Sequence, residues 1–277
     1  MKKNLGFRAV LHTHGAFHSL LQIGFVAWAY YQGFDTLAKR SIYEYDSVIA
    51  STPIEKELIV SRLGVRRCKV EFIPNGIEDH LLQRGKISER ESADSPASVL
   101  FLGRIAKEKN LELLVDAFRY IGKRSDAKLI LAGPDEGVIG RLKSLASNSG
   151  TRMEYVGEVH GEEKYELLSA CTVFAHPGLL EAFSVSLLEA QAFGKPCIVT
   201  GNGGQLYTAP PGETSLYARA DPLDFANKIL ILLNDKSLYQ QLSTNARKWS
   251  GQHVWSLVLP RYSSLYDRVC TASTKIA

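Results

Sequence analysis

Hydrophobic residues lie along this chain in short apolar runs, and longer stretches with a helical spacing of apolar positions separate most of these runs. Short apolar runs bounded by turn residues predict buried strands, and strands that alternate with helices predict a parallel sheet with helices on its faces. In the second half the predicted strands are 98–102, 128–132, 153–156, 172–176, 197–200 and 214–218. Six such strands predict a complete doubly wound α/β domain.

The first half of the chain carries fewer strands, predicted at 8–12, 47–50 and 69–73. Because a doubly wound domain usually occupies roughly 100–150 residues, we expect the first domain to be incomplete. Charged and serine-rich residues without an apolar rhythm then predict a linker. The expected division is a first domain at 1–88, a linker at 89–97, a second domain at 98–252 and a terminal helix at 253–277.

Capping residues mark the ends of several predicted helices. The stretch Thr52-Pro53-Ile54-Glu55 is a capping box with proline at the first helical position, and Gly64 ends that helix. Asp221-Pro222 predicts another helix start, and a further helix is predicted at 36–45.

A stretch without charged residues runs over 9–34 and is most apolar over 20–34. Its densest part is shorter than the roughly 20 residues that a membrane-spanning helix needs. We interpret it as a buried core helix, and the alternative is a surface that contacts a lipid or a lipid-linked acceptor.

The composition, with 45% hydrophobic and 22% charged residues, is that of an ordinary soluble globular protein. The net charge of +4 is spread over the chain and forms no dense basic face interleaved with aromatic residues, which argues against nucleic-acid binding. A slightly positive cleft for an anionic small molecule fits better.

The four cysteines lie far apart without a C-x-x-C spacing, so neither a disulfide framework nor a zinc site is indicated. The chain start has no signal-peptide pattern, and we expect a cytoplasmic protein.

The strongest chemical signal is a pair of glutamates, Glu181 and Glu189, spaced eight positions apart. Glu181 is predicted in a loop at the carboxyl end of a strand, Ser184 at a helix start, and Glu189 about one and a half turns into that helix. Ligands of open α/β sheets bind at this edge, and a helix start there offers free N–H groups to a phosphate. By itself the pair is equally compatible with a capped surface helix whose glutamates are solvated.

A second signal follows the strand at 98–102. Gly103 ends that strand and lets the backbone approach a ligand, and two cations, Arg104 and Lys109, follow it. A guanidinium and an ammonium can neutralise a diphosphate and stabilise its departure. The alternative is a solvated charge run beside a helix start.

With these motifs the chain resembles retaining glycosyltransferase family four, the sugar-nucleotide-dependent glycosyl transferases group 1. The matching motifs of the second half are Gly103-Arg104 with Lys109, Leu131-Ala132-Gly133-Pro134, Val156-Gly157, and the pair Glu181 and Glu189 with Gly194-Lys195-Pro196. In the first half they are His14-Gly15, Ala50-Ser51-Thr52 and Ile73-Pro74-Asn75-Gly76, and Trp255, Tyr262 and Tyr266 resemble the terminal helix that crosses back to the first domain. The resemblance implies a GT-B fold of two Rossmann-like domains that face a cleft, the first for the acceptor and the second for the donor.

The resemblance also implies a role for each site residue. Arg104 and Lys109 would hold the donor diphosphate, together with the N–H groups of Ser184 and Val185. Glu189 would bind the ribose and Glu181 the transferred sugar. Gly103, Gly133 and Val159 would border the nucleotide, and His14 would face the donor sugar. Taken alone, His14 reads equally well as a structural histidine at a strand end.

Three departures from the family pattern are visible. The opening strands and glycine-rich loop of the first domain are absent, Gly203-Gly204-Gln205 is not followed by the usual proline and glutamate, and Asn110 stands where glycine usually follows the lysine.

We therefore expect a glycosyltransferase that transfers a sugar from a nucleoside-diphosphate sugar to a hydroxyl of a sugar, polysaccharide or lipid-linked acceptor with retention of configuration. No Asp-x-Asp or metal-ligand cluster is present, so we expect no metal and no other cofactor.

The rival function is a nucleotide-sugar-binding module without turnover of its own, which could be a fragment, a decayed copy or one subunit that needs a separate partner for the missing front. Because the missing strands would leave apolar surface and a sheet edge uncovered, we expect the isolated protein to self-associate or to contact a membrane peripherally. A nicotinamide oxidoreductase is disfavoured, because the glycines from Gly133 to Gly140 have the wrong spacing for G-x-G-x-x-G.

Overall fold

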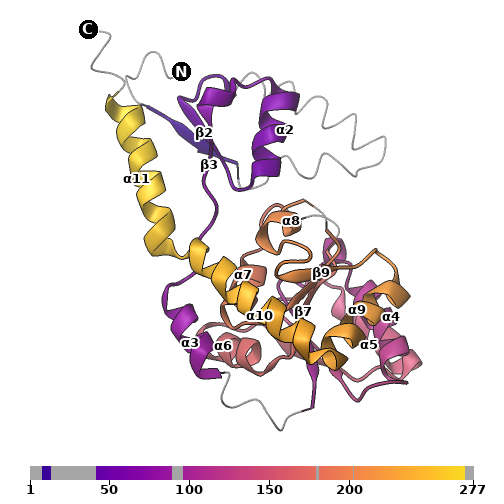
Figure 1. The fold of residues 1–277 in the computed structure, drawn as a ribbon. Coiled ribbons are helices and arrows are strands. Elements are labelled where there is room, and N and C mark those ends of the chain that lie inside the picture. Colours follow the sequence, from indigo (N-terminus) through magenta and orange to yellow (C-terminus); the bar gives the residue numbers. More distant parts are fainter. Residues whose placement is uncertain (1–7, 14–41, 89–95, 179–180, 202, 272–277) are drawn as a thin grey trace, which may run out of the picture. The chain divides into compact units, whose positions relative to one another are not determined.

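The computed structural model describes residues 8–13, 42–88, 96–178, 181–201 and 203–271 (Figure 1). These residues form two compact units. The first consists of residues 1–76, 181–183 and 253–277, and the second of residues 77–180 and 184–252. The chain thus changes units at Gly76, whereas the charge pattern had suggested residue 88 as the end of the first domain.

The second unit contains a six-stranded sheet in which each pair of neighbouring strands is parallel. Its strands are β4 (Ser98–Leu102), β5 (Lys128–Ala132), β6 (Met153–Gly157), β7 (Val173–His176), β8 (Cys197–Val199) and β9 (Ser215–Tyr217). Their order, β6-β5-β4-β7-β8-β9, reverses direction between β4 and β7. In doubly wound sheets ligands bind beside such a reversal, at the carboxyl ends of the strands. The prediction of a parallel α/β fold is confirmed.

Helices cover this sheet in two groups (Figure 1): α4 contacts α5 and α9, and α7 contacts α3, α8 and α10. The helices are α3 (His80–Ser88), α4 (Leu111–Ile121), α5 (Ile139–Ser149), α6 (Gly161–Ala170), α7 (Val185–Ala192), α8 (Gln205–Thr208), α9 (Pro222–Asn234) and α10 (Lys236–Ser250). Short 3₁₀ turns lie at η4 (Lys107–Lys109) and η5 (Gly251–His253). As predicted, Asp221 caps α9 by accepting a hydrogen bond from the Asp224 N–H.

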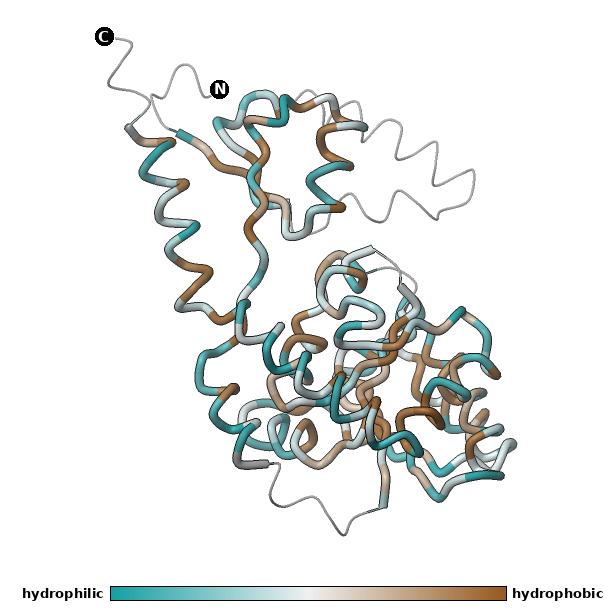
Figure 2. Tube along the Cα trace, viewed as in Figure 1, coloured by the Kyte–Doolittle hydropathy of each residue, from teal (hydrophilic) through white to brown (hydrophobic). Residues whose placement is uncertain are grey.

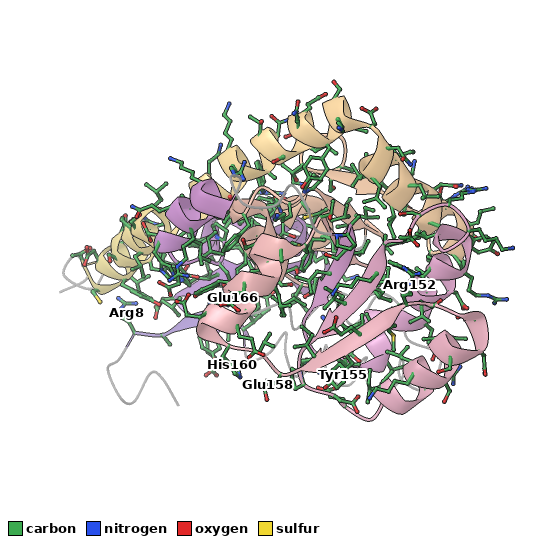
Figure 3. All side chains as sticks on the ribbon, turned by 90° about the horizontal axis from the view of Figure 1, so that it is seen from below. Arg8, Arg152, Tyr155, Glu158, His160 and Glu166 are labelled. Carbon is green, nitrogen blue, oxygen red and sulfur yellow. The ribbon has the colours of Figure 1, made fainter. Side chains whose placement is uncertain are left out.

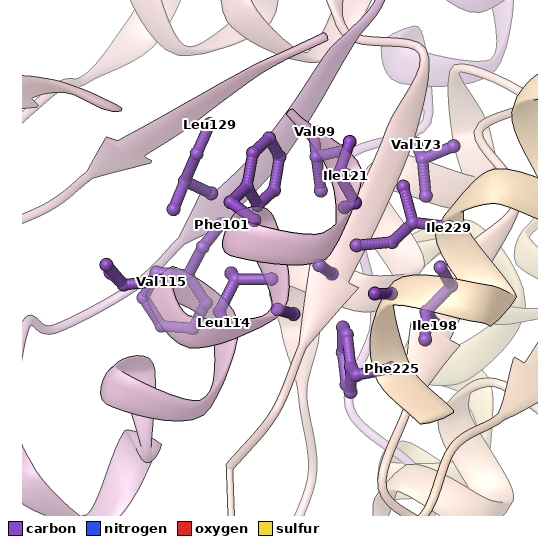
Figure 4. Packing of buried hydrophobic residues seen from close by; sticks show 14 of the residues in the cluster. Val99, Phe101, Leu114, Val115, Ile121, Leu129, Val173, Ile198, Phe225 and Ile229 are labelled. Atoms are coloured by element: carbon purple, nitrogen blue, oxygen red, sulfur yellow. The ribbon is translucent and has the colours of Figure 1, made fainter. Parts of the chain in front are cut away.

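The main core of the second unit lies between its central strands and the helices α4 and α9 (Figure 4). Phe101 of β4 and Phe225 of α9 are among its largest fully buried side chains. The hydropathy of the chain follows this arrangement, with apolar residues concentrated on the strands and on the packed helix faces (Figure 2). Burial of this apolar surface is the main force that holds the second unit together.

The first unit contains a parallel three-stranded sheet in the order β1-β2-β3. Its elements are β1 (Val10–His12), β2 (Ser47–Ala50), α2 (Pro53–Leu63), η3 (Arg67–Lys69), β3 (Val70–Phe72) and α11 (Trp255–Thr271). Helix α11 packs on this sheet through Val258 and Leu265, and the terminal helix belongs to the first unit.

The predicted start of α2 is confirmed in its first half, the cap by Thr52. Thr52 Oγ1 accepts from the Glu55 N–H at 3.1 Å, and Gly64 ends the helix in the left-handed conformation with φ 68°. The buried carboxylate of Glu55 accepts from the Ser51 N–H and from the Thr13 hydroxyl, at 2.7 and 2.6 Å. These bonds hold the carboxyl ends of β1 and β2 to the start of α2.

Two expectations lie mostly outside the described residues, namely the apolar stretch at 9–34 and the helix at 36–45. Among the described residues, no helix combines the length and the apolar character needed to cross a membrane.

Candidate functional site

Three glycines shape the carboxyl edge of the second unit's sheet, one after each of β4 and β5 and one at the end of β6. Gly103, Gly133 and Gly157 have φ values of 151°, 136° and 94°, which disfavour side chains. The Gly103 N–H donates to Ala132 O at 3.0 Å, and the Gly133 N–H donates to Gly157 O at 2.6 Å. A Cβ atom on Gly133 would overlap the backbone carbonyl of Gly103. The three strand ends therefore approach one another closely. At this edge of the sheet they present backbone groups in place of side chains.

Arg104 follows Gly103 at this edge and is half exposed. Its guanidinium pairs with Glu136 at 2.5 Å and with Glu108 at 2.7 Å. The hydrogen bond to Glu136 raises the pKa of Arg104, so the group stays positively charged. The two carboxylates hold the guanidinium at the carboxyl end of β4, the strand beside the reversal of strand order.

Lys109 ends the 3₁₀ turn η4, and Asn110 follows it in the left-handed conformation with φ 52° and ψ 40°. Asn110 is the only residue other than glycine with positive φ among the described residues. Glycine adopts this conformation without strain, and asparagine tolerates it better than most residues. The departure from glycine at this position therefore preserves the turn.

No side chain caps the start of α7. Asp221 and Asp235 accept hydrogen bonds from the first turns of α9 and α10, whereas Ser184 at the start of α7 makes no such bond, and the starts of α4, α6 and α8 likewise have no side-chain cap. The Ser184 hydroxyl instead lies 3.2 Å from the Ser186 hydroxyl. The first N–H groups of α7, beginning with Val185, thus keep donors that a helix leaves without an internal partner.

Glu189 lies in the second turn of α7, and Oε1 of its carboxylate accepts from Lys164 Nζ at 2.7 Å. Lys164 belongs to the first turn of α6. Both side chains are largely buried, with 22% of Lys164 and 13% of Glu189 exposed.

The remaining predicted site residues are Glu181, Val159 and His14. Glu181 is partly buried, and residues 181–183 group with the first unit, whereas Arg104 and Glu189 belong to the second. Val159 is buried in the loop between β6 and α6, where Figure 3 labels its neighbours Glu158 and His160. His14 lies outside the described residues.

A buried polar network at the ends of β7 and β8 was not predicted from the sequence. Gln205 Oε1 accepts from the Thr200 N–H at 3.1 Å, and its Nε2 donates to Gly178 O at 2.9 Å. The same Nε2 lies 3.1 Å from Nδ1 of the buried His176. The missing proline and glutamate after Gly204 mark this segment in the sequence, but two of the partners of Gln205, His176 and Gly178, lie 29 and 27 positions away.

The helix after β5 does not offer a dinucleotide site. Asp135 Oδ1 accepts from the N–H groups of Val138 and Ile139, at 2.8 and 3.0 Å, and so occupies the start of α5 with a carboxylate. A pyrophosphate would need these donors. The geometry thus adds to the spacing argument against a nicotinamide enzyme.

No group of three or more metal-ligating side chains is found in the part of the chain that the structure describes. Nε2 of His12 lies 3.3 Å from the Ser51 hydroxyl oxygen. His12 stands two positions before His14, which was predicted as a site residue.

The fold and this edge define an α/β protein of the parallel, doubly wound class. A family model described as "Glycosyl transferases group 1" matches residues 83–249, and one described as "Glycosyltransferase Family 4" matches residues 1–81. The first match covers more than half of the chain, and the protein therefore belongs to the glycosyl transferases group 1 family. The resemblance found in the sequence is confirmed.

Among curated relatives, the mannosylfructose-phosphate synthase of Agrobacterium fabrum is 27% identical over 80% of this chain and 53% of its own length. The D-inositol 3-phosphate glycosyltransferase of Nocardia farcinica is 26% identical over 79% of this chain and 51% of its own. The chain thus spans about half the length of these relatives.

Two solved structures show the same fold. Sucrose-phosphate synthase from Thermosynechococcus elongatus has a TM-score of 0.83 at 24% identity, with 98% of this chain and 70% of that chain covered. HepE from Anabaena in complex with UDP-glucose has a TM-score of 0.76 at 19% identity, covering 96% of this chain and 74% of the other. The GT-B fold is confirmed.

Proposed function

We propose that this protein binds a nucleoside-diphosphate sugar and transfers the sugar to a hydroxyl group with retention of configuration. The observation that carries the proposal is the uncapped start of α7, which lies at the same strand-end edge as Gly103 and Arg104. N–H donors, a helix dipole and a guanidinium together suit a diphosphate. Membership in the family supports the same chemistry.

In this proposal Arg104, Lys109 and the N–H groups of Ser184 and Val185 hold the diphosphate. Glu189 accepts hydrogen bonds from the ribose. The loops of Gly133 and Val159 border the base, and Glu181 and His14 face the transferred sugar.

The proposed reaction is a front-face substitution. The bond from the sugar's anomeric carbon to the phosphate oxygen breaks while the acceptor oxygen bonds to the same face. The acceptor's proton passes to the departing phosphate oxygen, so no enzyme nucleophile is needed. Positive charge near the diphosphate stabilises the negative charge that develops on it. We propose that this charge comes from Arg104 and Lys109 and that no metal ion is needed.

A second candidate function is nucleotide-sugar binding without independent turnover. It is supported by the extent of the matches, which cover about half the length of the curated relatives. Incubating the purified protein with UDP-, GDP- and ADP-sugars distinguishes the two functions, because the transferase releases free nucleoside diphosphate and the binding module does not.

Calorimetry with UDP, GDP and ADP tests the diphosphate site. Arg104→Ala and Lys109→Ala should each weaken binding by about 1.5–3 kcal/mol, the range for a hydrogen bond to a charged group. Arg119→Ala and Lys248→Ala remove exposed cations on α4 and α10 and should leave binding unchanged. Unaltered affinity in both site variants would refute the diphosphate role. Loss of binding in EDTA that magnesium restores would refute metal independence.

A further inference from the structure

Glu189 is held by the protein through one of its two carboxylate oxygens. Oε1 accepts from Lys164 Nζ at 2.7 Å, whereas Oε2 has no protein partner among the described residues. A carboxylate offers about four lone-pair sites, so Lys164 leaves most of this capacity for a ligand. The side chain is only 13% exposed, which leaves little of it open to solvent.

Lys164 is itself fixed by an aromatic ring. Its Nζ lies 5.2 Å from the ring centroid of Tyr165, and the guanidinium of Arg84 on α3 lies 5.1 Å from the same ring. Cations over an aromatic face are attracted by its negative charge density. Tyr165 also stacks with Phe193, just after α7, at 6.3 Å between centroids. The ring is therefore held from both α3 and α7.

Arg84 connects back to the start of α6. Both of its terminal nitrogens donate to the carboxylate of Glu162, at 2.5 and 2.6 Å. Two parallel bonds of this kind fix the relative orientation of the groups. All of these residues belong to the second unit, so the support of Lys164 reaches from α3 through α6 to α7.

We propose that Lys164 is a positioning residue that holds the Glu189 carboxylate for the two neighbouring ribose hydroxyls and so makes the site select ribonucleotides over deoxyribonucleotides. The inference rests on the proposed ribose role of Glu189. A carboxylate with a fixed rotamer can accept from both hydroxyls of a ribose at once. A freely rotating carboxylate must first be ordered, and the entropy lost in that ordering offsets the affinity gained from the two hydroxyls. A nucleotide that lacks both hydroxyls gains nothing from the arrangement.

The test compares binding of UDP, GDP and ADP with binding of their 2′,3′-dideoxy forms by calorimetry. Lys164→Met should lower the affinity for the preferred ribonucleotide about tenfold, the scale of one hydrogen bond to a charged group, and leave the dideoxy form unchanged. Lys164→Arg, which keeps the charge, should restore part of the ratio. Lys128→Met is the matched control, because Lys128 pairs with Glu154 at 3.0 Å at the amino-terminal start of β5.

The variant Glu189→Ala distinguishes a failure of the positioning role of Lys164 from a failure of the proposed function. If Glu189→Ala removes the ribose preference and Lys164→Met does not, the positioning role is wrong and the proposed ribose site stands. If Glu189→Ala leaves the preference intact, or if the wild-type protein binds none of the three nucleotides, the proposed function fails with it. An equal loss of affinity for ribo and dideoxy forms in Lys164→Met would show a merely structural role.

Discussion

Gly133 has both a backbone conformation and a neighbour that exclude a side chain. Its φ is 136°, and a Cβ atom would overlap the carbonyl of Gly103. The pair of glycines brings the ends of β4 and β5 closer together than side chains would allow. We therefore expect a substitution at Gly133 to change both the stability of the protein and the geometry of the strand ends where the nucleotide is proposed to bind.

Gly133→Ala should destabilise the protein by about 2–4 kcal/mol, from overpacking and a strained φ together. The matched control is Gly140→Ala in α5, where nothing lies within 4 Å of the new Cβ. That variant should be neutral or more stable by about 0.5–1 kcal/mol, because alanine favours helix. Urea unfolding measures both, and equal stabilities would contradict the steric account.

The four thiols divide by environment. Burial raises the pKa of Cys171 to about 11 and that of Cys197 well above its ordinary value, whereas Cys68 and Cys270 are exposed. Because the thiolate is the reactive form, a raised pKa leaves the buried pair protonated at pH 8.

Titration of the native protein with a thiol reagent at pH 8 should therefore modify Cys68 and Cys270 quickly and the buried pair only after unfolding. Mass spectrometry of the modified peptides identifies the sites. Rapid modification of Cys171 in the folded protein would mean that the end of α6 is more open than described.

At the scale of elements, α7 is positioned by contacts with residues distant in sequence. Gln191 on its buried face donates to Thr208 O of α8 at 2.7 Å. Gln205, the first residue of α8, bonds to Thr200 and Gly178, at the ends of β8 and β7. Helix α8 thus connects α7, which carries Glu189, to the carboxyl ends of β7 and β8.

Gln205→Leu should destabilise the protein by about 2–4 kcal/mol, because it leaves the Thr200 N–H and the Gly178 carbonyl buried without this partner. Gln240→Leu, at an exposed position of α10, is the control and should change stability by less than about 0.5 kcal/mol. Thermal unfolding compares them. A loss in Gln205→Leu no larger than that of the control would show that the network contributes little.

At the scale of the whole molecule, the two units have separate cores. The cluster around Phe101 and Phe225 lies entirely in the second unit, and the clusters around Ile59 and Val258 lie in the first. Arg104, Lys109, Ser184, Val185 and Glu189 all belong to the second unit.

A chain of residues 77–252 should therefore fold cooperatively and bind UDP, GDP or ADP with an affinity within about threefold of the full protein, a difference below 1 kcal/mol. It should show no sugar transfer, because the first unit is absent. Circular dichroism and calorimetry check the two parts. An unfolded fragment, or one that binds no nucleotide bound by the full chain, would show that the second unit depends on the first.

The sequence by itself determined the elements and their order. Apolar runs at 98–102 and 128–132 coincide with β4 and β5, and the caps at Thr52 and Asp221 start α2 and α9 as predicted, because burial pattern and capping are local properties. The motif spacing also indicated the family and the residues of the proposed donor site.

Only the tertiary structure decided which side chains support that site. Lys164 pairs with Glu189 from another helix, Gln205 joins strand ends that lie 27 and 5 positions away in sequence, and Asp135 closes the start of α5 while α7 stays uncapped. The contacts of Lys164 with Glu189 and of Gln205 with Gly178 join residues that only the order and packing of the sheet bring together, and no periodicity or spacing in one sequence encodes them. The division at Gly76 was missed for the same reason, because α3 joins the second unit through its contacts with α6 and α7.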